Sequence, residues 1–236
     1  MKIEPRYLDG TYLSHNPNWD REDAAWKANQ VFCIFKDQKI EPVSICEVGC
    51  GSGDILRSLR TMLPKTRMVG YDISPQVSEF WKEAKADPVG GGVEFHLGDF
   101  HAFNAEIFHI LLMLDVFEHV RDPFTFLEES RSHAQKFVFH IPLDLSSSGV
   151  ARKGPLLNVR RRVGHLNYYT KDLALEILTD CGYKIIDWRY TGASLNSPNR
   201  SWRTRLASVP RRLFYSINKD AGVRLLGGET LLVLAE

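Results

Sequence analysis

Long apolar runs are missing from this chain of 236 residues. The longest one, residues 107–116, has about half of the ~20 residues that a membrane-spanning helix needs, and it contains His109 and Asp115. The N-terminal stretch, residues 1–6, has no apolar core of the kind found in secretory signals. The sequence therefore predicts neither a transmembrane helix nor a signal peptide.

Cysteine is scarce, with four residues and no Cys-x-x-Cys pair, and no group of histidines and acids has the spacing of a metal site. We therefore expect reduced thiols in a cytoplasmic protein and no bound metal ion. Glycine (17) and proline (11) occur at ordinary frequency, without a repeating period. This excludes collagen-like fibres and solenoids.

Apolar residues make up 44% of the chain, enough for one large core, and we expect a single domain over residues 1–236 that begins with a helical segment, residues 1–40. The net charge is +1, but it is unevenly distributed. Residues 146–163 hold five basic and no acidic residues, and residues 190–228 hold seven basic residues and one acid. Two basic segments thus interrupt a mildly acidic body.

Strand and helix patterns alternate regularly from residue 44 to residue 141, and after the first basic segment interrupts this alternation, a helix and a sixth strand follow. Strands are expected at 44–48, 67–72, 93–97, 107–114, 136–141, 183–190 and 230–234, and helices at 21–40, 54–63, 75–86, 124–133 and 170–180. The last strand arrives without a helical crossover and is expected to insert antiparallel. The prediction is an α/β fold with a doubly wound, Rossmann-like, seven-stranded sheet, mostly parallel, with the last strand antiparallel and helices on both faces.

A glycine-rich loop, EVGCGSG at residues 47–53, joins the first strand to a helix. Glycines allow positive φ and close approach of a ligand to the backbone, and the helix N-terminus offers free N–H groups. The plain alternative is a tight strand-to-helix turn. The glycine spacing differs from the Gly-x-Gly-x-x-Gly of dinucleotide sites, and Glu47 would repel a pyrophosphate but suit a ligand that carries an ammonium group.

Acidic residues also end the second and third predicted strands. Asp72 could accept hydrogen bonds from both hydroxyls of a ribose, or could simply be an acid at a helix N-terminus. Asp99 and Phe100 could meet the amino group and the face of an adenine. Together with Glu47, these residues would line one crevice at the carboxyl ends of neighbouring strands, where open α/β sheets bind ligands.

These motifs resemble those of class I S-adenosylmethionine-dependent methyltransferases over about residues 41–190 and the final strand. The stretch LDVFEHVRDP, residues 114–123, is similar to that of small-molecule enzymes, including the ubiquinone and menaquinone biosynthesis type. The resemblance implies S-adenosyl-L-methionine as cofactor and S-adenosyl-L-homocysteine as product. It implies that the methionine part of the cofactor contacts Glu47 and the loop residues Gly49, Cys50, Gly51 and Gly53. The ribose would contact Asp72 and Ile73, and the adenine Asp99 and Phe100. Leu114, Asp115 and Val116 would flank the cofactor.

Two histidines are candidates for catalysis. A hydroxyl acceptor must lose its proton, and His119 follows the fourth strand with an unperturbed pKa of about 6.5 that suits a base at neutral pH. It could equally only cap or orient its loop. His165 resembles a substrate-side position of related enzymes, whereas His140 is expected to be packed, with Asp144 able to reach the same opening.

The N-terminal segment, with Tyr12, Trp19, Trp26 and Lys27, lies outside the predicted sheet. In similar enzymes such a segment folds over the cofactor, so that an aromatic ring could face the sulfonium and Lys27 the carboxylate. Ordinary core packing of the two tryptophans is the alternative.

The basic segments, 146–163 and 190–228, are expected to form a lid over the substrate opening. The second has amphipathic helical character despite Pro210, with apolar Trp202, Leu206, Val209, Leu213, Phe214 and Ile217 between arginines. Such a lid would suit an anionic, sugar or lipid-carried small-molecule acceptor approached at a membrane surface, whereas the plain alternative is a solvated basic face. Nucleic acid is disfavoured, because the body is acidic and no nucleic-acid-binding motif is present.

Two other functions remain open. A binding module on the same fold could hold a nucleotide, or S-adenosylmethionine, without chemistry. A nicotinamide-dependent oxidoreductase is disfavoured by the glycine spacing.

Overall fold

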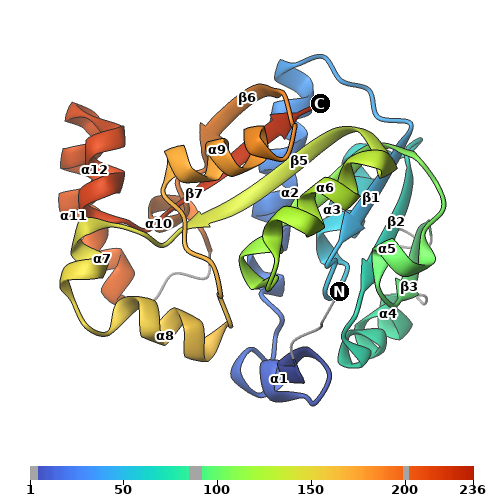
Figure 1. Cartoon of the computed structure of the whole chain (residues 1–236), viewed down its shortest axis with the longest axis horizontal. Helices are drawn as coiled ribbons and strands as arrows, with labels where there is room; N and C mark the ends of the chain where they lie inside the picture. The colour runs from blue at the N-terminus through green and yellow to red at the C-terminus, as the bar shows by residue number, and fades with distance from the viewer. Residues whose placement is uncertain (1–4, 85–91, 199–201) are drawn as a thin grey trace.

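The computed structural model describes residues 5–84, 92–198 and 202–236. Its seven strands form one sheet in the order β3-β2-β1-β4-β5-β7-β6 (Figure 1). β7 is antiparallel to both of its neighbours, and the remaining pairs are parallel. The strands are β1 (Ser44–Val48), β2 (Arg67–Asp72), β3 (Val93–Leu97), β4 (Phe108–Leu114), β5 (Ala134–Leu143), β6 (Ile185–Tyr190) and β7 (Glu229–Ala235). The Rossmann-like sheet predicted from the sequence is confirmed.

Helices cover both faces of the sheet, because successive strand residues point to opposite sides and both sides are apolar. In β1, for example, Ile45 packs in one core, whereas Cys46 and Val48 pack in the other. The first core also takes apolar side chains of α2 (Arg21–Asp37), α3 (Asp54–Met62) and α4 (Ser78–Ala84). The second takes side chains of α5 (Phe100–Phe103), α6 (Pro123–Ser130) and α9 (Lys171–Asp180).

The two basic segments are helical and lie together at one side of the sheet (Figure 1). The first contains α7 (Ser147–Ala151) and α8 (Pro155–Arg162). The second contains α10 (Ala193–Asn196), α11 (Trp202–Ile217), which continues through Pro210, and α12 (Lys219–Leu226). The Ser148 hydroxyl donates a hydrogen bond to the Leu226 carbonyl at 3.2 Å, which ties α7 to α12. Arg200 lies outside the described residues.

The remaining short elements are α1 (Thr11–His15) and the 3-10 turns η1 (Pro5–Tyr7), η2 (Pro75–Val77), η3 (Phe117–His119) and η4 (Arg131–His133). The predicted helix at 75–86 is η2 followed by α4, and residues 85 and 86 lie outside the described residues. No helix in the described parts of the chain is both long and apolar enough to cross a bilayer.

The predicted sixth strand begins two residues too early. Gly182 has φ +84, and the Tyr183 N–H bonds back to the Leu178 carbonyl. This bond ends α9 and prevents Tyr183 from pairing in the sheet. β5 is longer than predicted because its first residue pairs with Phe108 of β4 and its last with Glu229 of β7.

Candidate active site

The glycine loop after β1 forms the floor of a cleft at the carboxyl ends of the parallel strands. Gly49, Gly51 and Gly53 have φ values of +71, +52 and +79, which disfavour any side chain there. A Cβ on Gly51 would lie 2.5 Å from the Trp19 ring, and one on Gly49 would lie 2.9 Å from Val116. The loop therefore needs glycine both for its backbone and for close cover by its neighbours.

Two adjoining cavities, of about 140 and 340 Å³, open along this loop. Five residues line both of them: Tyr12, Trp19, Gly49, Asp115 and His119. The predicted site residues divide between the two. The smaller cavity is lined by Gly49, Asp72, Ile73, Asp99, Phe100, Asp115 and Val116, and the larger by Glu47, Gly49, Cys50, Gly51, Leu114 and Asp115. Gly53 lines neither, but it caps the start of α3.

Asp72 ends β2 and is held by backbone N–H groups. Its two oxygens accept hydrogen bonds from Gly51 and Ser74, each at 2.8 Å. Burial raises the pKa of Asp72 to about 6, although these bonds act in the opposite direction. Asp99 is the N-cap of α5 and accepts from the His101 N–H, while Phe100 packs edge-on against Tyr71. The acid at the end of β2 and the aromatic residue after β3 thus share the wall of the smaller cavity.

Glu47 is buried, and its Oε2 has no hydrogen-bond partner among the described residues. Burial raises the pKa of this carboxyl well above its ordinary value. A buried acceptor without a partner is costly, so its place on the larger cavity's wall suits a ligand that brings a donor, such as an ammonium group.

Asp115 follows β4 in a left-handed conformation, with φ +56. It forms an ion pair with Lys27 Nζ at 2.6 Å and accepts a hydrogen bond from His140 Nδ1 at 2.7 Å. Despite its burial, the charges of His140 and Lys27 hold the pKa of Asp115 well below its ordinary value. His140 in turn contacts the Thr230 hydroxyl through Nε2 at 3.0 Å. Lys27 therefore has a protein partner, and His140 is packed as predicted and pairs with Asp115.

The N-terminal segment covers the cleft. The rings of Tyr7 and Tyr12 lie 5.1 Å apart, and those of Tyr12 and Trp19 lie 4.8 Å apart. Trp26 lines the larger cavity and meets His140 edge-on at 6.1 Å. Trp19 and Trp26 pack against neighbouring rings and also line the larger cavity. Core packing and a position facing the cofactor therefore do not exclude each other for these tryptophans.

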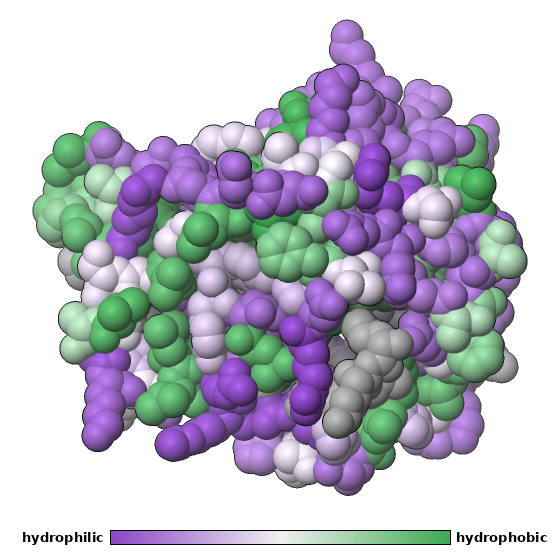
Figure 2. All heavy atoms as spheres, in the orientation of Figure 1, coloured by the Kyte–Doolittle hydropathy of each residue, from purple (hydrophilic) through white to green (hydrophobic). Residues whose placement is uncertain are grey.

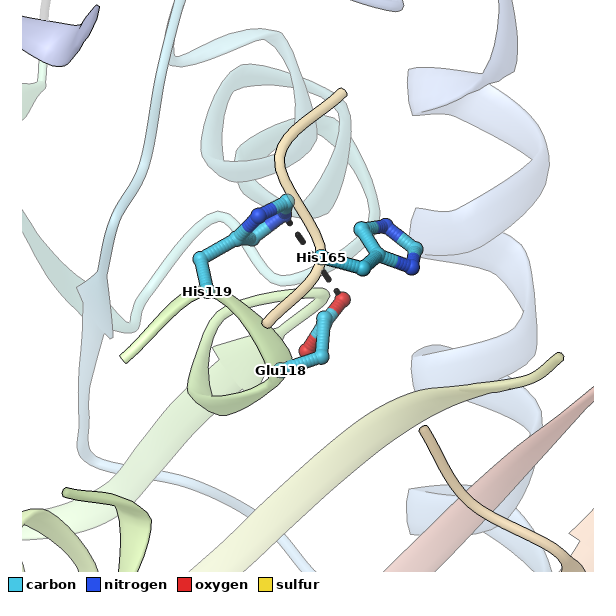
Figure 3. Close-up of side chains that lie close together, drawn as sticks. All are labelled: Glu118, His119 and His165. Carbon is cyan, nitrogen blue, oxygen red and sulfur yellow. Dashed lines mark ion pairs between the residues drawn. The ribbon is translucent and has the colours of Figure 1, made fainter. Parts of the chain in front are cut away.

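His119 and His165, the two predicted catalytic residues, come together with their rings 4.8 Å apart. Figure 3 shows them converging with Glu118, which precedes His119 in η3. Burial, followed by the charge of His165, lowers the pKa of His119 to about 3, so its ring is neutral but less basic than its unperturbed pKa suggests. The ligand atoms of all three residues lie within 4.8 Å of one another, which makes the group a candidate metal site.

Sequence reasoning did not identify Glu118, Tyr7 or the role of Asp144 at this site. Tyr7 hydrogen-bonds His119 Nδ1 at 2.8 Å, and Asp144 accepts from His165 Nδ1 at 2.5 Å. The sequence signal for Glu118 is its place next to His119 in the stretch at residues 114–123.

Comparison with known proteins gives one family model, described as a methyltransferase domain, which matches residues 20–187. A curated tRNA (guanine-N(7)-)-methyltransferase from Arabidopsis thaliana is 30% identical over 83 residues, covering 35% of this chain. This chain thus spans 27% of the length of that relative.

Several solved structures have the same fold. The magnesium protoporphyrin IX methyltransferase of Synechocystis, with bound S-adenosylhomocysteine, has a TM-score of 0.60 and 16% identity over 89% of this chain and 82% of that one. The plantazolicin methyltransferase, in complex with a desmethyl substrate analogue and S-adenosylhomocysteine, has a TM-score of 0.62 and 17% identity over 98% and 91%. An O-methyltransferase family protein from Burkholderia thailandensis has a TM-score of 0.60 and 12% identity over 98% and 63%.

Proposed function

The chain belongs to the methyltransferase domain family, and on that premise we propose that it methylates a hydroxyl group of a small-molecule acceptor. The use of S-adenosylmethionine and the transfer of its methyl group follow from the family. The choice of a hydroxyl rests on one observation. His119 lines both cavities, so a proton-accepting or metal-binding group stands where the cofactor cavity meets the second one.

The smaller cavity is proposed to hold the adenosine part of the cofactor. Asp72 and Ile73 would bind the ribose, and Asp99 and Phe100 the adenine. Asp72 supports this role because its oxygens are already oriented by two backbone N–H groups and have lone pairs left for hydroxyl donors.

The methionine part would lie along the glycine loop. Glu47, with its unpartnered oxygen, would accept hydrogen bonds from the ammonium group. Gly49, Cys50, Gly51 and Gly53 would allow close approach of the backbone, and Leu114, Asp115 and Val116 would flank the cofactor. Since Lys27 is paired with Asp115, its proposed contribution is to fix that strained residue.

When bound, S-adenosylmethionine supplies a methyl group on a positively charged sulfur, and its transfer to an acceptor oxygen releases S-adenosylhomocysteine and the proton of the hydroxyl. The protein must hold the acceptor in line and exclude water. Tyr7, Tyr12 and Trp19 would provide the cover. His119 and His165 would assist in removing the proton, because the neutral ring of His119 has a nitrogen lone pair available at pH 7.

The acceptor would enter through the larger cavity, beneath a lid made of the two basic segments. Val163 of the first segment and Ala193 and Ser197 of the second line this cavity. Val163 directly follows three arginines at the end of α8, and the side chains of all three are exposed: Arg160, Arg161 and Arg162. This arrangement supports an acceptor with an anionic group, such as a sugar nucleotide or a lipid-carried metabolite of the ubiquinone or menaquinone type.

Peripheral contact with a membrane is supported by α11. Trp202, Leu206, Leu213 and Ile217 are all more than 60% exposed, and their spacing places them on one side of the helix. Figure 2 shows hydrophobic surface over α11 and α12. A tRNA acceptor, the substrate named for the curated relative, is less favoured, since this chain covers 27% of that protein.

The experiment has three arms. Calorimetry should show binding of S-adenosylhomocysteine. Incubation with S-adenosylmethionine and a panel of phenols, sugars, their phosphorylated forms, amines and tRNA should then release S-adenosylhomocysteine with a hydroxyl compound. Co-sedimentation with anionic and neutral liposomes at low and high salt tests the membrane contact. Turnover only on amines or tRNA would refute the proposed acceptor.

A further inference from the structure

Glu118 has a buried carboxyl group that precedes His119 in η3. Its side chain is 0% exposed, and neither carboxyl oxygen has a hydrogen bond within the described residues. His119 Nε2 lies 3.9 Å from Oε1, which is too far for a hydrogen bond. Leaving both oxygens of a buried carboxyl unsatisfied is costly, so the position calls for a ligand that carries positive charge or donors.

The two histidines beside Glu118 are anchored through their Nδ1 atoms. His165 Nδ1 donates to Asp144 at 2.5 Å, which leaves its Nε2 with a free lone pair. His119 Nδ1 bonds to the Tyr7 hydroxyl at 2.8 Å, and that hydroxyl also lies 3.4 Å from the Val163 carbonyl. If Tyr7 donates to Val163 and accepts from His119, the Nε2 of His119 has a free lone pair too. Histidines that bind metal ions usually donate their other ring N–H to a carboxylate or a carbonyl, which fixes the orientation of the ring, and His165 has such a bond.

We propose that Glu118, His119 and His165 bind a divalent transition-metal ion at the wall of the acceptor cavity. Two imidazoles and one carboxylate suit zinc, cobalt or manganese better than the all-oxygen sites of magnesium and calcium. Metal–ligand distances of about 2.0–2.2 Å place tetrahedral ligands about 3.4 Å apart, so atoms that lie up to 4.8 Å apart must approach one another by up to about 1.4 Å. The spacing of residues along the chain predicted no metal site, because His165 reaches this cluster from a separate loop (Figure 3).

The site keeps a side open for a fourth ligand. His119 and His165 line the larger cavity, while Glu118 lies behind them. This inference rests on the proposed function and specifies it further: His119 and His165 would assist proton removal as ligands of the ion, and not as bases, because the ion occupies their Nε2 lone pairs. The acceptor hydroxyl would coordinate the ion from the cavity, which lowers the pKa of that hydroxyl. Its O–H bond then breaks, the proton passes to water, and the oxygen keeps the electron pair while bound to the ion.

The test uses untagged, chelator-treated protein and titration with Zn²⁺ in a calorimeter, followed by Co²⁺ in a spectrophotometer. The proposal predicts one Zn²⁺ per chain and visible Co²⁺ bands without sulfur charge transfer, which excludes the cysteines as ligands. Glu118→Gln and His165→Ala should weaken Zn²⁺ binding at least tenfold, and Asp144→Asn by about 10–100-fold. His109→Ala and Glu106→Gln, at the opposite end of β4, are the matched controls and should bind like the wild type.

Binding of S-adenosylhomocysteine is measured on the same samples and separates the two proposals. Glu118→Gln should retain it together with its melting temperature, which shows that the variant is folded. A wild-type protein that binds S-adenosylhomocysteine but no stoichiometric Zn²⁺ would overturn the metal site alone. Equal Zn²⁺ affinity in Glu118→Gln, His165→Ala and the controls would also overturn it. Failure to bind S-adenosylhomocysteine would instead count against the proposed function.

Discussion

Nδ1 of His165 donates a hydrogen bond to the carboxylate of Asp144 at 2.5 Å. This bond fixes the tautomer of the histidine and leaves Nε2 as the atom available for chemistry. Asp144 and His165 flank the first basic segment on its two sides, so their bond closes the loop that carries the helices α7 and α8. The proposed lid and the proposed site residue His165 are therefore structurally linked.

Asp72→Ala should weaken binding of S-adenosylhomocysteine by about 10²–10⁴-fold, because it removes two charge-assisted hydrogen bonds to the ribose hydroxyls and each contributes about 1.5–3 kcal/mol. Calorimetry measures the change. The variant should remain folded, although it loses the acceptor for the Gly51 and Ser74 N–H groups. Unchanged affinity in a folded Asp72→Ala protein would contradict the ribose assignment.

Affinity for S-adenosylhomocysteine should fall as the pH drops through about 6. Burial raises the pKa of Asp72 to about 6, so in the free protein this carboxyl is protonated below about pH 6. The carboxyl must lose its proton before it can accept hydrogen bonds from two ribose hydroxyls, and binding is therefore weaker at low pH. The loss approaches tenfold per pH unit. Asp72→Asn should reduce this dependence, and Glu47→Gln should remove the part that comes from Glu47, whose pKa is also raised. An equally steep profile in both variants would rule out these carboxyls as the cause.

His119→Ala should lower turnover on a hydroxyl acceptor by about 10²–10⁴-fold, the range for a lost group that assists proton removal. Affinity for S-adenosylhomocysteine should change far less. Steady-state kinetics and calorimetry on the same preparation test this. A folded variant with normal turnover would mean that His119 only helps to orient the 3-10 turn η3.

Gly51→Ala should reduce cofactor affinity at least tenfold, because its Cβ would collide with the Trp19 ring and a positive φ would have to be kept. Gly154→Ala is the matched control, since its Cβ would meet only Asn158 at 3.6 Å. Equal affinity in the two variants would show that Trp19 and the loop are not packed as described.

Lys27→Met should lower the free energy of unfolding by at most about 3 kcal/mol, the lower end for a broken buried ion pair, because this pair is only partly buried and Asp115 keeps its bond to His140. The double variant Lys27→Met/Asp115→Asn should recover part of this loss. Urea denaturation measures both. Additive losses in the double variant would mean that the two side chains do not stabilise each other.

The sheet could be predicted from the sequence because its strands are short apolar runs separated by clear turn and helix signals. For the same reason, the sequence could predict that Asp72 and Asp99 lie together at one edge of the sheet, since both lie at the ends of parallel strands; their contact with the cofactor stays a prediction. The pairing of Lys27 with Asp115 and the cluster of Glu118 with His165 could not, because they join side chains far apart in the chain. Their contacts depend on how loops and α2 pack, and that leaves no local pattern.

S-adenosylmethionine is proposed to bind across the two cavities with its reactive sulfur beside His119. A crystal structure of the complex with S-adenosylhomocysteine would show whether it does. The ribose hydroxyls should lie within hydrogen-bond distance of Asp72, and the amino group should lie near Glu47. The sulfur should lie at the passage shared by Tyr12, Asp115 and His119. A ligand bound away from Asp72, or with its sulfur turned away from the larger cavity, would contradict this proposal.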